Sequence, residues 1–223
     1  MKKKDLVIFD LDGTIIDSAP SLHKAVNFML KKLSLEPLDL QTVRDFIGNG
    51  AAILVKRALV RDRAYQNYDI DEALAKRALN ILLEYYSANL TDDTILYEGA
   101  KQTLQALQEN GYKIALATNK PNQFIQEILE HFQIDTYFNY TIGAGVVANK
   151  KPHPQMLLKV CEELETSPQK AIMIGDTEND IVAAQNAKMD SIALTHGYSH
   201  NDLRELNPTF VCNDFSQINK ILL

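Results

Sequence analysis

The stretch DLVIFDLDGT, residues 5–14, joins a short apolar run to two carboxylates, a glycine and a threonine. A near-continuous run such as LVIF favours extended structure and is typical of a parallel strand covered on both faces. The sequence therefore predicts a buried strand that delivers Asp10 and Asp12 to a loop, where Gly13 permits backbone conformations that other residues resist. Open α/β sheets bind ligands at the carboxyl ends of their strands, so we expect chemistry in this loop. An ordinary Asp-Gly turn is the alternative interpretation.

The composition of the 223-residue chain is that of a globular protein with room for a substantial core or a large insertion. Its net charge of −6 argues against a broad nucleic-acid-binding surface, although a small anionic substrate is compatible with it. The two cysteines, Cys161 and Cys212, have no metal-ligand spacing, and we expect both in the core. No signal peptide or run of ~20 apolar residues is evident. We therefore expect a cytoplasmic monomer or homodimer without nucleic-acid or membrane partners.

A long helical segment separates the first predicted strand from the next one, which begins at Tyr112. A strand, helix, strand unit needs only about 30 residues, so most of the intervening chain must be an insertion. Its apolar residues recur at the three- and four-residue spacing of helices. In the last of these helices, over residues 71–88, the predicted apolar side consists of Leu74, Ala78, Ile81, Leu82 and Tyr85. We expect a helical cap domain at residues 18–93, inserted into a catalytic core formed by residues 1–17 and 94–223.

The rest of the chain alternates between strand-like and helix-like patterns. This alternation predicts an α/β fold with a parallel sheet covered on both faces. Polar residues follow apolar strand-like runs at Thr118, Lys151, Asp176 and Asp180. Their recurrence at strand ends favours a functional site, rather than an ordinary turn, at Asp10.

Taken in order, the motifs DLDGT, TNKP, KKPHP and GDTEND resemble the four motifs of haloacid dehalogenase superfamily phosphatases, and the resemblance extends over essentially the whole chain. Within the superfamily, VRDFIGNGAAILVKRAL at residues 43–59 and the Gly-Tyr pair after Thr195 are similar to the phosphoglycolate phosphatase group. The resemblance implies a Rossmann-like parallel-sheet core of the haloacid dehalogenase type with an inserted all-helical cap. It also implies hydrolysis of 2-phosphoglycolate, a small phosphorylated metabolite, to glycolate and phosphate.

The resemblance assigns distinct roles to the two aspartates of DLDGT. In the superfamily, the first aspartate attacks phosphorus and forms a phosphoaspartyl intermediate, and the second acts as general acid and then as general base. Asp10 and Asp12 occupy these two positions. The presence of Asp12 argues against dehalogenation, because relatives with that activity lack the second aspartate.

A metal ion is expected on physical grounds, because a phosphate dianion among several carboxylates is repelled unless cations offset the charge. Hard oxygen ligands and phosphate chemistry favour Mg²⁺. By resemblance, its ligands are a carboxylate oxygen of Asp10, the backbone carbonyl of Asp12 and the carboxylate of Asp176. Asp180 would bind the ion directly or through a water molecule.

The phosphoryl group has its own predicted contacts. Thr118 matches the second superfamily motif, and its hydroxyl can donate to a phosphate oxygen, while Asn119 can contribute its backbone N–H. Lys151 matches the third motif and would hold the phosphoryl group and steady Asp10. Lys150 is the less favoured alternative, because Lys-Pro rather than Lys-Lys defines this motif.

The cap is expected to carry substrate specificity, because the core motifs recognise only phosphate and metal. The turn formed by Gly48, Asn49 and Gly50 can offer backbone N–H groups to a small carboxylate at a helix start. Alternatives within the same fold are a phosphatase for pyrophosphate or a sugar phosphate, or a phosphosugar mutase. A receiver-type signalling module also uses a phosphorylated aspartate, but such modules lack a large helical insertion.

Overall fold

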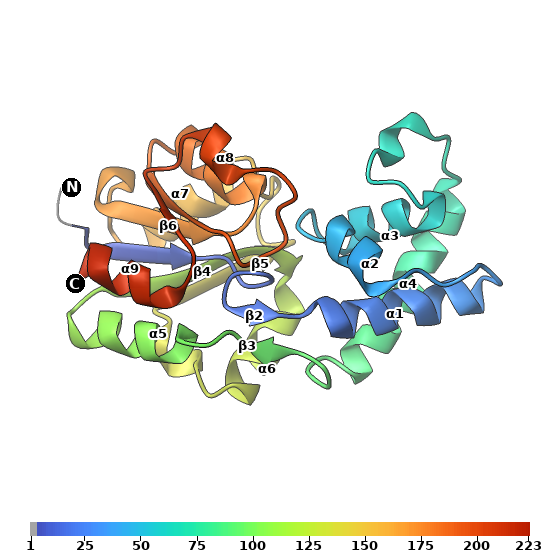
Figure 1. The fold of residues 1–223 in the computed structure, drawn as a ribbon, viewed down its shortest axis with the longest axis horizontal. Coiled ribbons are helices and arrows are strands. Elements are labelled where there is room, and N and C mark those ends of the chain that lie inside the picture. The colour runs from blue at the N-terminus through green and yellow to red at the C-terminus, as the bar shows by residue number, and fades with distance from the viewer. Residues whose placement is uncertain (1–3) are drawn as a thin grey trace. The chain divides into compact units, whose positions relative to one another are not determined.

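The computed structural model describes residues 4–223, and the larger of its two compact units contains a six-stranded sheet (Figure 1). Residues 1–3 of the predicted core lie outside the described residues. The strand order is β5-β4-β1-β6-β7-β8, and each neighbouring pair is parallel. The strands are β1 (Leu6–Phe9), β4 (Lys113–Pro121), β5 (Tyr140–Ala144), β6 (Ala171–Gly175), β7 (Asp190–Leu194) and β8 (Phe210–Cys212). The predicted α/β fold with a parallel sheet is therefore confirmed.

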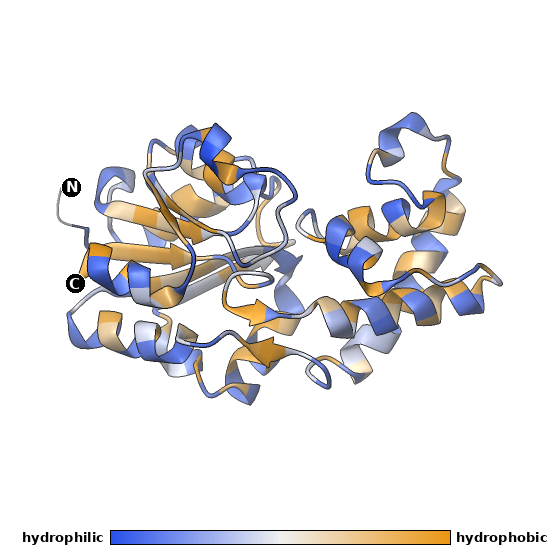
Figure 2. Cartoon of the chain, viewed as in Figure 1, coloured by the Kyte–Doolittle hydropathy of each residue, from blue (hydrophilic) through white to orange (hydrophobic). Residues whose placement is uncertain are grey.

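Strand β1 runs through the middle of the sheet, and its four residues are apolar and fully buried (Figure 2). It pairs with β4 on one side and with β6 on the other, so that Phe9 lies opposite both Leu116 and Ile174. From β1 the chain builds the sheet outward in one direction through β4 and β5, and then in the other through β6, β7 and β8. Ligands of open α/β sheets bind at such a reversal, beyond the carboxyl ends of the strands. Asp10, the residue after β1, occupies that position.

Helices cover both faces of this sheet, with α7 and α8 on one face and α5 and α9 on the other (Figure 1). The helices of this unit are α5 (Ala100–Glu109), α6 (Ile125–His131), α7 (Gln155–Glu163), α8 (Glu178–Asn186) and α9 (Phe215–Leu222). Beneath α7 and α8, alternate strand residues form a buried cluster with helix residues: Leu6, Ile8, Ala115, Ala117, Ala171, Met173, Met156, Leu157, Val160, Cys161, Ala183 and Ala184. Both cysteines are buried, as predicted.

The second compact unit, Ser18–Ile95, is built from helices. They are α1 (Ala19–Lys32), α2 (Leu40–Phe46), α3 (Ala51–Val60) and α4 (Glu72–Ala88). Helix α1 packs against α2 and α4, and α3 also packs against α2 and α4. The short strands β2 (Ile16–Asp17) and β3 (Ile95–Leu96) pair with each other where the chain passes between the units.

The buried side of α4 includes the predicted Ala78 and Leu82 but differs from the prediction near both ends of the helix. The structure buries Ala75, Ala78, Leu82 and Tyr86, whereas Leu74 is 36% exposed. Apolar residues stand next to each other near both ends of the helix, at Leu74-Ala75 and at Tyr85-Tyr86. Either member of each pair continues the three- and four-residue spacing of an apolar side, so the sequence pattern alone does not choose between them. Packing against α1 and α3 selects the phase that contains Ala75.

Short 3₁₀ helices connect several of these elements. They are Tyr65–Asn67, Asn122–Phe124, Asp135–Tyr137, Pro168–Lys170 and Leu203–Leu206. Among the helices of residues 4–223, none is both long enough and apolar enough to cross a membrane.

Candidate active site

Asp10 follows directly on β1 and is 7% exposed. Its backbone N–H donates to the carbonyl of Ile174 on β6 at 2.9 Å, so the sheet pairing holds the residue beyond the end of the strand. Burial raises the pKa of Asp10 to about 6; the charge of Lys151 opposes this shift and the charge of Asp180 adds to it. A carboxylate in this position is costly to ionise unless cations accompany it.

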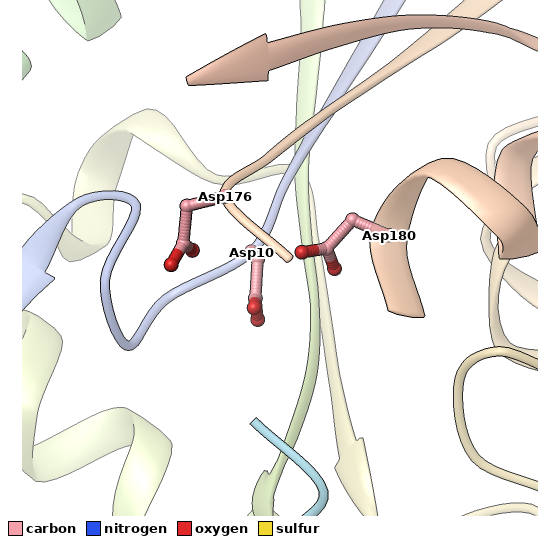
Figure 3. Close-up of side chains that lie close together, drawn as sticks. All are labelled: Asp10, Asp176 and Asp180. Carbon is pink, nitrogen blue, oxygen red and sulfur yellow. The ribbon is translucent and has the colours of Figure 1, made fainter. Parts of the chain in front are cut away.

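Two more predicted acids lie beside Asp10, Asp176 from the loop after β6 and Asp180 from the start of α8 (Figure 3). Each of the three side chains offers one oxygen, and these oxygens all lie within 4.8 Å of one another. Asp176 and Asp180 are fully buried. Burial, followed by the charges of Asp180 and Asp10, holds the pKa of Asp176 well above its usual value. The three acids form a buried group that can hold a metal ion.

Hydrogen bonds fix the orientation of Asp176 and Asp180. Asp176 accepts from the hydroxyl of Thr14 at 2.6 Å and from the backbone N–H of Tyr198 at 2.7 Å. Asp180 accepts from the backbone N–H of Thr177 at 3.0 Å and from its hydroxyl at 2.8 Å, as part of a capping box at the start of α8. Both carboxylates are therefore held in place by groups that are not themselves candidate ligands.

Three glycines allow the backbone to approach these carboxylates closely. A Cβ atom on Gly13 would lie 2.2 Å from an oxygen of Asp176, and one on Gly197 would lie 2.1 Å from the same oxygen. A Cβ atom on Gly175 would lie 2.3 Å from Asp180. Such separations are far inside van der Waals contact, so the packing around the acids requires glycine at all three positions.

Lys151 places its ammonium between two of the acids, 3.0 Å from Oδ1 of Asp10 and 2.5 Å from Oδ1 of Asp180. Burial lowers the pKa of Lys151, but the charges of Asp10 and Asp180 outweigh that effect and raise it above its ordinary value. The side-chain amide of Asn119 donates to the backbone carbonyl of Lys151 at 2.9 Å. This contact ties the end of β4 to the lysine loop, a role of Asn119 that the sequence did not suggest.

Asp12 contacts a lysine to which sequence reasoning gave no role. The ammonium of Lys120 donates to both carboxylate oxygens of Asp12, at 2.9 and 3.2 Å, and Lys120 is only 4% exposed. Strand β4 extends as far as Pro121, so it carries Thr118 and Lys120 as well as the apolar residues predicted for it. Lysine is seldom fully buried, and the only available signal was its place within the TNKP motif.

The predicted cap residues lie between α2 and α3 of the second unit. Gly48 and Gly50 have φ values of 113° and 84°, in the left-handed region that favours glycine. Gly50 immediately precedes the first turn of α3. Close by in the sequence, the buried guanidinium of Arg57 donates to the carbonyl of Phe46 at 2.7 Å, so that side chain supports the backbone ahead of the turn.

Relatives with known names match nearly the whole chain. A phosphoglycolate phosphatase from Psychrobacter arcticus is 41% identical over 99% of this chain and 96% of its own length. A phosphoglycolate phosphatase from Colwellia psychrerythraea is 39% identical over 98% of this chain and 96% of its own length. The crystal structure of a predicted phosphoglycolate phosphatase from Haemophilus somnus matches with a TM-score of 0.92 and 34% identity, with complete coverage of both chains.

A family model gives the broader assignment. The model described as haloacid dehalogenase-like hydrolase matches residues 7–194, a segment that contains the whole second compact unit, most of the first and all the acids discussed above. The match agrees with the arrangement of the strands and with the buried acids at their carboxyl ends. This chain therefore belongs to the haloacid dehalogenase-like hydrolase family.

Proposed function

We propose that this chain hydrolyses 2-phosphoglycolate to glycolate and inorganic phosphate through a phosphoaspartyl intermediate on Asp10. The observation that carries the proposal is the setting of Asp10, which lies at the end of the central strand, 3.0 Å from Lys151 and beside Asp176 and Asp180. The substrate is inferred from the named relatives, which are 41% and 39% identical to this chain over nearly its full length.

The reaction proceeds in two steps. In the first, a carboxylate oxygen of Asp10 attacks phosphorus, the bond from phosphorus to the ester oxygen breaks, and Asp12 gives that oxygen a proton as glycolate leaves. In the second, water attacks the phosphorus of the acyl phosphate, and Asp12 takes the proton that the water loses. The bond from phosphorus to Asp10 then breaks, which releases phosphate and restores the carboxylate.

Three residues at the strand ends would bind the phosphoryl group. Thr118 and Asn119 lie at the end of β4, next to β1, and both are buried. The Thr118 hydroxyl and the Asn119 backbone N–H would donate to phosphate oxygens. Lys151 would contribute a fixed positive charge, which is worth most where water is excluded.

The donor set of the three acids fits Mg²⁺. The group has three buried carboxylates, and the ammonium of Lys151 pairs with two of them, Asp10 and Asp180, so the group keeps an excess of negative charge that a hard cation offsets. A carboxylate oxygen of Asp10, the backbone carbonyl of Asp12 and the carboxylate of Asp176 would hold the ion, with Asp180 bound directly or through water. When bound, the ion supplies positive charge that allows a phosphate dianion to approach these carboxylates.

The two compact units would have separate roles in catalysis and in substrate selection. Residues 1–17 and 94–223 form the proposed catalytic core, and residues 18–93 form the proposed cap that selects the substrate. The boundary between the compact units, after Asp17 and after Ile95, supports this division. Backbone N–H groups of Gly48, Asn49 and Gly50, ahead of α3, would donate to the substrate carboxylate and would leave part of its charge for a cation to offset.

The test is phosphate release, in the presence of Mg²⁺, from a panel of 2-phosphoglycolate, pyrophosphate, sugar phosphates, nucleotides and an aryl phosphate. We expect 2-phosphoglycolate to lead in kcat/KM by a factor of about 100, equivalent to about 2.7 kcal/mol of transition-state discrimination. Equal rates across the panel, or a better rate with another phosphate, would overturn the substrate assignment.

A pair of variants tests the mechanism separately from the substrate. Asp10→Asn should abolish turnover of every substrate in the panel, because it removes the nucleophile. The matched control is Asp5→Asn, just before the amino end of the same strand, where the carboxylate forms an exposed ion pair with Lys170. Turnover by Asp10→Asn at the rate of Asp5→Asn would exclude the phosphoaspartyl route.

A further inference from the structure

Lys120 is a buried cation that the mechanism above does not use. Only 4% of its surface is exposed, and its ammonium lies 2.9 and 3.2 Å from the two oxygens of Asp12. Its backbone N–H lies 3.3 Å from the hydroxyl oxygen of Thr118, to which it donates. Burying a lysine costs free energy that a paired charge must offset. The sequence thus maintains a positive charge directly beside the proposed acid and base of the reaction.

The position of Asp12 determines which part of the bound substrate lies near the Lys120 ammonium. In the proposed reaction Asp12 touches the ester oxygen, so a substituent close to that oxygen comes close to the Lys120 ammonium. In 2-phosphoglycolate, a single methylene group separates the ester oxygen from the carboxylate. We propose that the Lys120 ammonium binds this carboxylate and thereby selects phosphate monoesters that carry a negative charge next to the ester oxygen.

The structure shows the Lys120 ammonium paired with a carboxylate. The ammonium contacts both oxygens of one carboxylate, that of Asp12, and the substrate offers a second carboxylate of the same chemistry. Charge-assisted hydrogen bonds of this kind are stronger than those between neutral groups. Lys151, the other buried lysine of the site, is engaged by Asp10 and Asp180 and faces the phosphoryl position instead. The two lysines would therefore bind opposite ends of the substrate.

The inference rests on the proposed function and is tested with a matched pair of substrates, 2-phosphoglycolate and ethyl phosphate. Ethyl phosphate replaces the carboxylate with a methyl group and keeps the phosphate. Lys120→Met should lower kcat/KM for 2-phosphoglycolate about 100-fold, the usual cost of truncating one partner of a buried charge pair, and that for ethyl phosphate far less. Lys120→Arg, which keeps the charge, should retain more of the preference than Lys120→Met. The control is Lys76→Met, which removes an exposed lysine on α4 and should leave both values unchanged.

The outcomes separate this inference from the proposed function. If the wild-type protein hydrolyses the two substrates equally well, the proposed function fails. If the wild-type preference is large and Lys120→Met keeps it, with both substrates slowed alike, Lys120 only supports Asp12 and this inference is wrong. Lys120→Gln provides the same test should Lys120→Met not fold, because the glutamine amide can still donate to Asp12 but carries no charge.

Discussion

The hydroxyl of Thr14 donates a 2.6 Å hydrogen bond to the carboxylate of Asp176. This contact joins the loop after β1 to the loop after β6, which are far apart in the sequence and adjacent in the sheet. Partners of this kind orient metal-binding carboxylates, and their loss typically costs about 10- to 100-fold in metal affinity or activity. We therefore expect Thr14 to orient Asp176 in the proposed site.

Replacing Thr14 tests that role. Thr14→Val removes the donor and keeps the shape, and it should raise the Mg²⁺ concentration required for half-maximal activity about 10- to 100-fold. Thr14→Ser keeps the hydroxyl and should stay close to the wild-type protein. The measurement is the initial rate as a function of Mg²⁺ concentration. Identical Mg²⁺ curves for Thr14→Val and Thr14→Ser would contradict the role.

Lys151 and its neighbour Lys150 give a second prediction. Lys151→Met removes the ammonium that lies between Asp10 and Asp180, and kcat should fall by about 10²- to 10³-fold, as for other lost electrostatic contacts to a transition state. Lys150→Met should leave kcat close to the wild-type value. Steady-state kinetics at saturating substrate compares the two, and the reverse order of effects would show that the predicted cation is the wrong lysine.

Metal binding should be visible in stability as well as in activity. A chelator should abolish the phosphatase activity, and added Mg²⁺ should restore that activity. Because the ion binds the folded protein, Mg²⁺ at 100 times its dissociation constant should stabilise the protein by about 2.7 kcal/mol. Thermal unfolding with and without Mg²⁺ measures this effect. Asp176→Asn should lose it and Asp5→Asn should keep it; the same Mg²⁺-dependent shift in both variants would exclude the site at Asp176.

The second compact unit offers a prediction about packing. Leu82 of α4 is fully buried, so Leu82→Ala should lower the free energy of unfolding by about 2–5 kcal/mol. Leu74 on the same helix is 36% exposed, and Leu74→Ala should cost less than about 1 kcal/mol. Urea unfolding of the two variants measures both changes. A larger loss for Leu74→Ala would place Leu74 on the buried side of the helix, as the sequence pattern predicted.

These residues also show which parts of the fold the sequence can reveal. The apolar run before Asp10 identifies the central strand, since four consecutive buried residues leave few other possibilities. The face of α4 was predicted wrongly around Leu74, because neighbouring apolar residues fit two phases and only the partner helices decide. Local patterns thus identify an element more readily than the side it buries.

The residues of the candidate site also include some that the sequence predicts and some that it does not. Asp10, Asp176 and Asp180 stand in motifs at strand ends, and the structure brings one oxygen of each within 4.8 Å of the others. Thr14 and Lys120 were not assigned, because their roles depend on contacts with residues distant in the sequence. Threonine and lysine are both mostly exposed residue types, so residue type alone does not predict either contact.

The capping box of α8 has a consequence for how this activity can be lost. Asp180 belongs to the buried acid group and also accepts from the backbone N–H of Thr177, so one side chain serves the site and the start of the helix. Replacing Asp180 removes one of the two reciprocal hydrogen bonds of this capping box, whereas Asp10 takes no part in it. In homologous proteins that have lost catalytic activity but still fold, we therefore expect Asp10 to be substituted more often than Asp180.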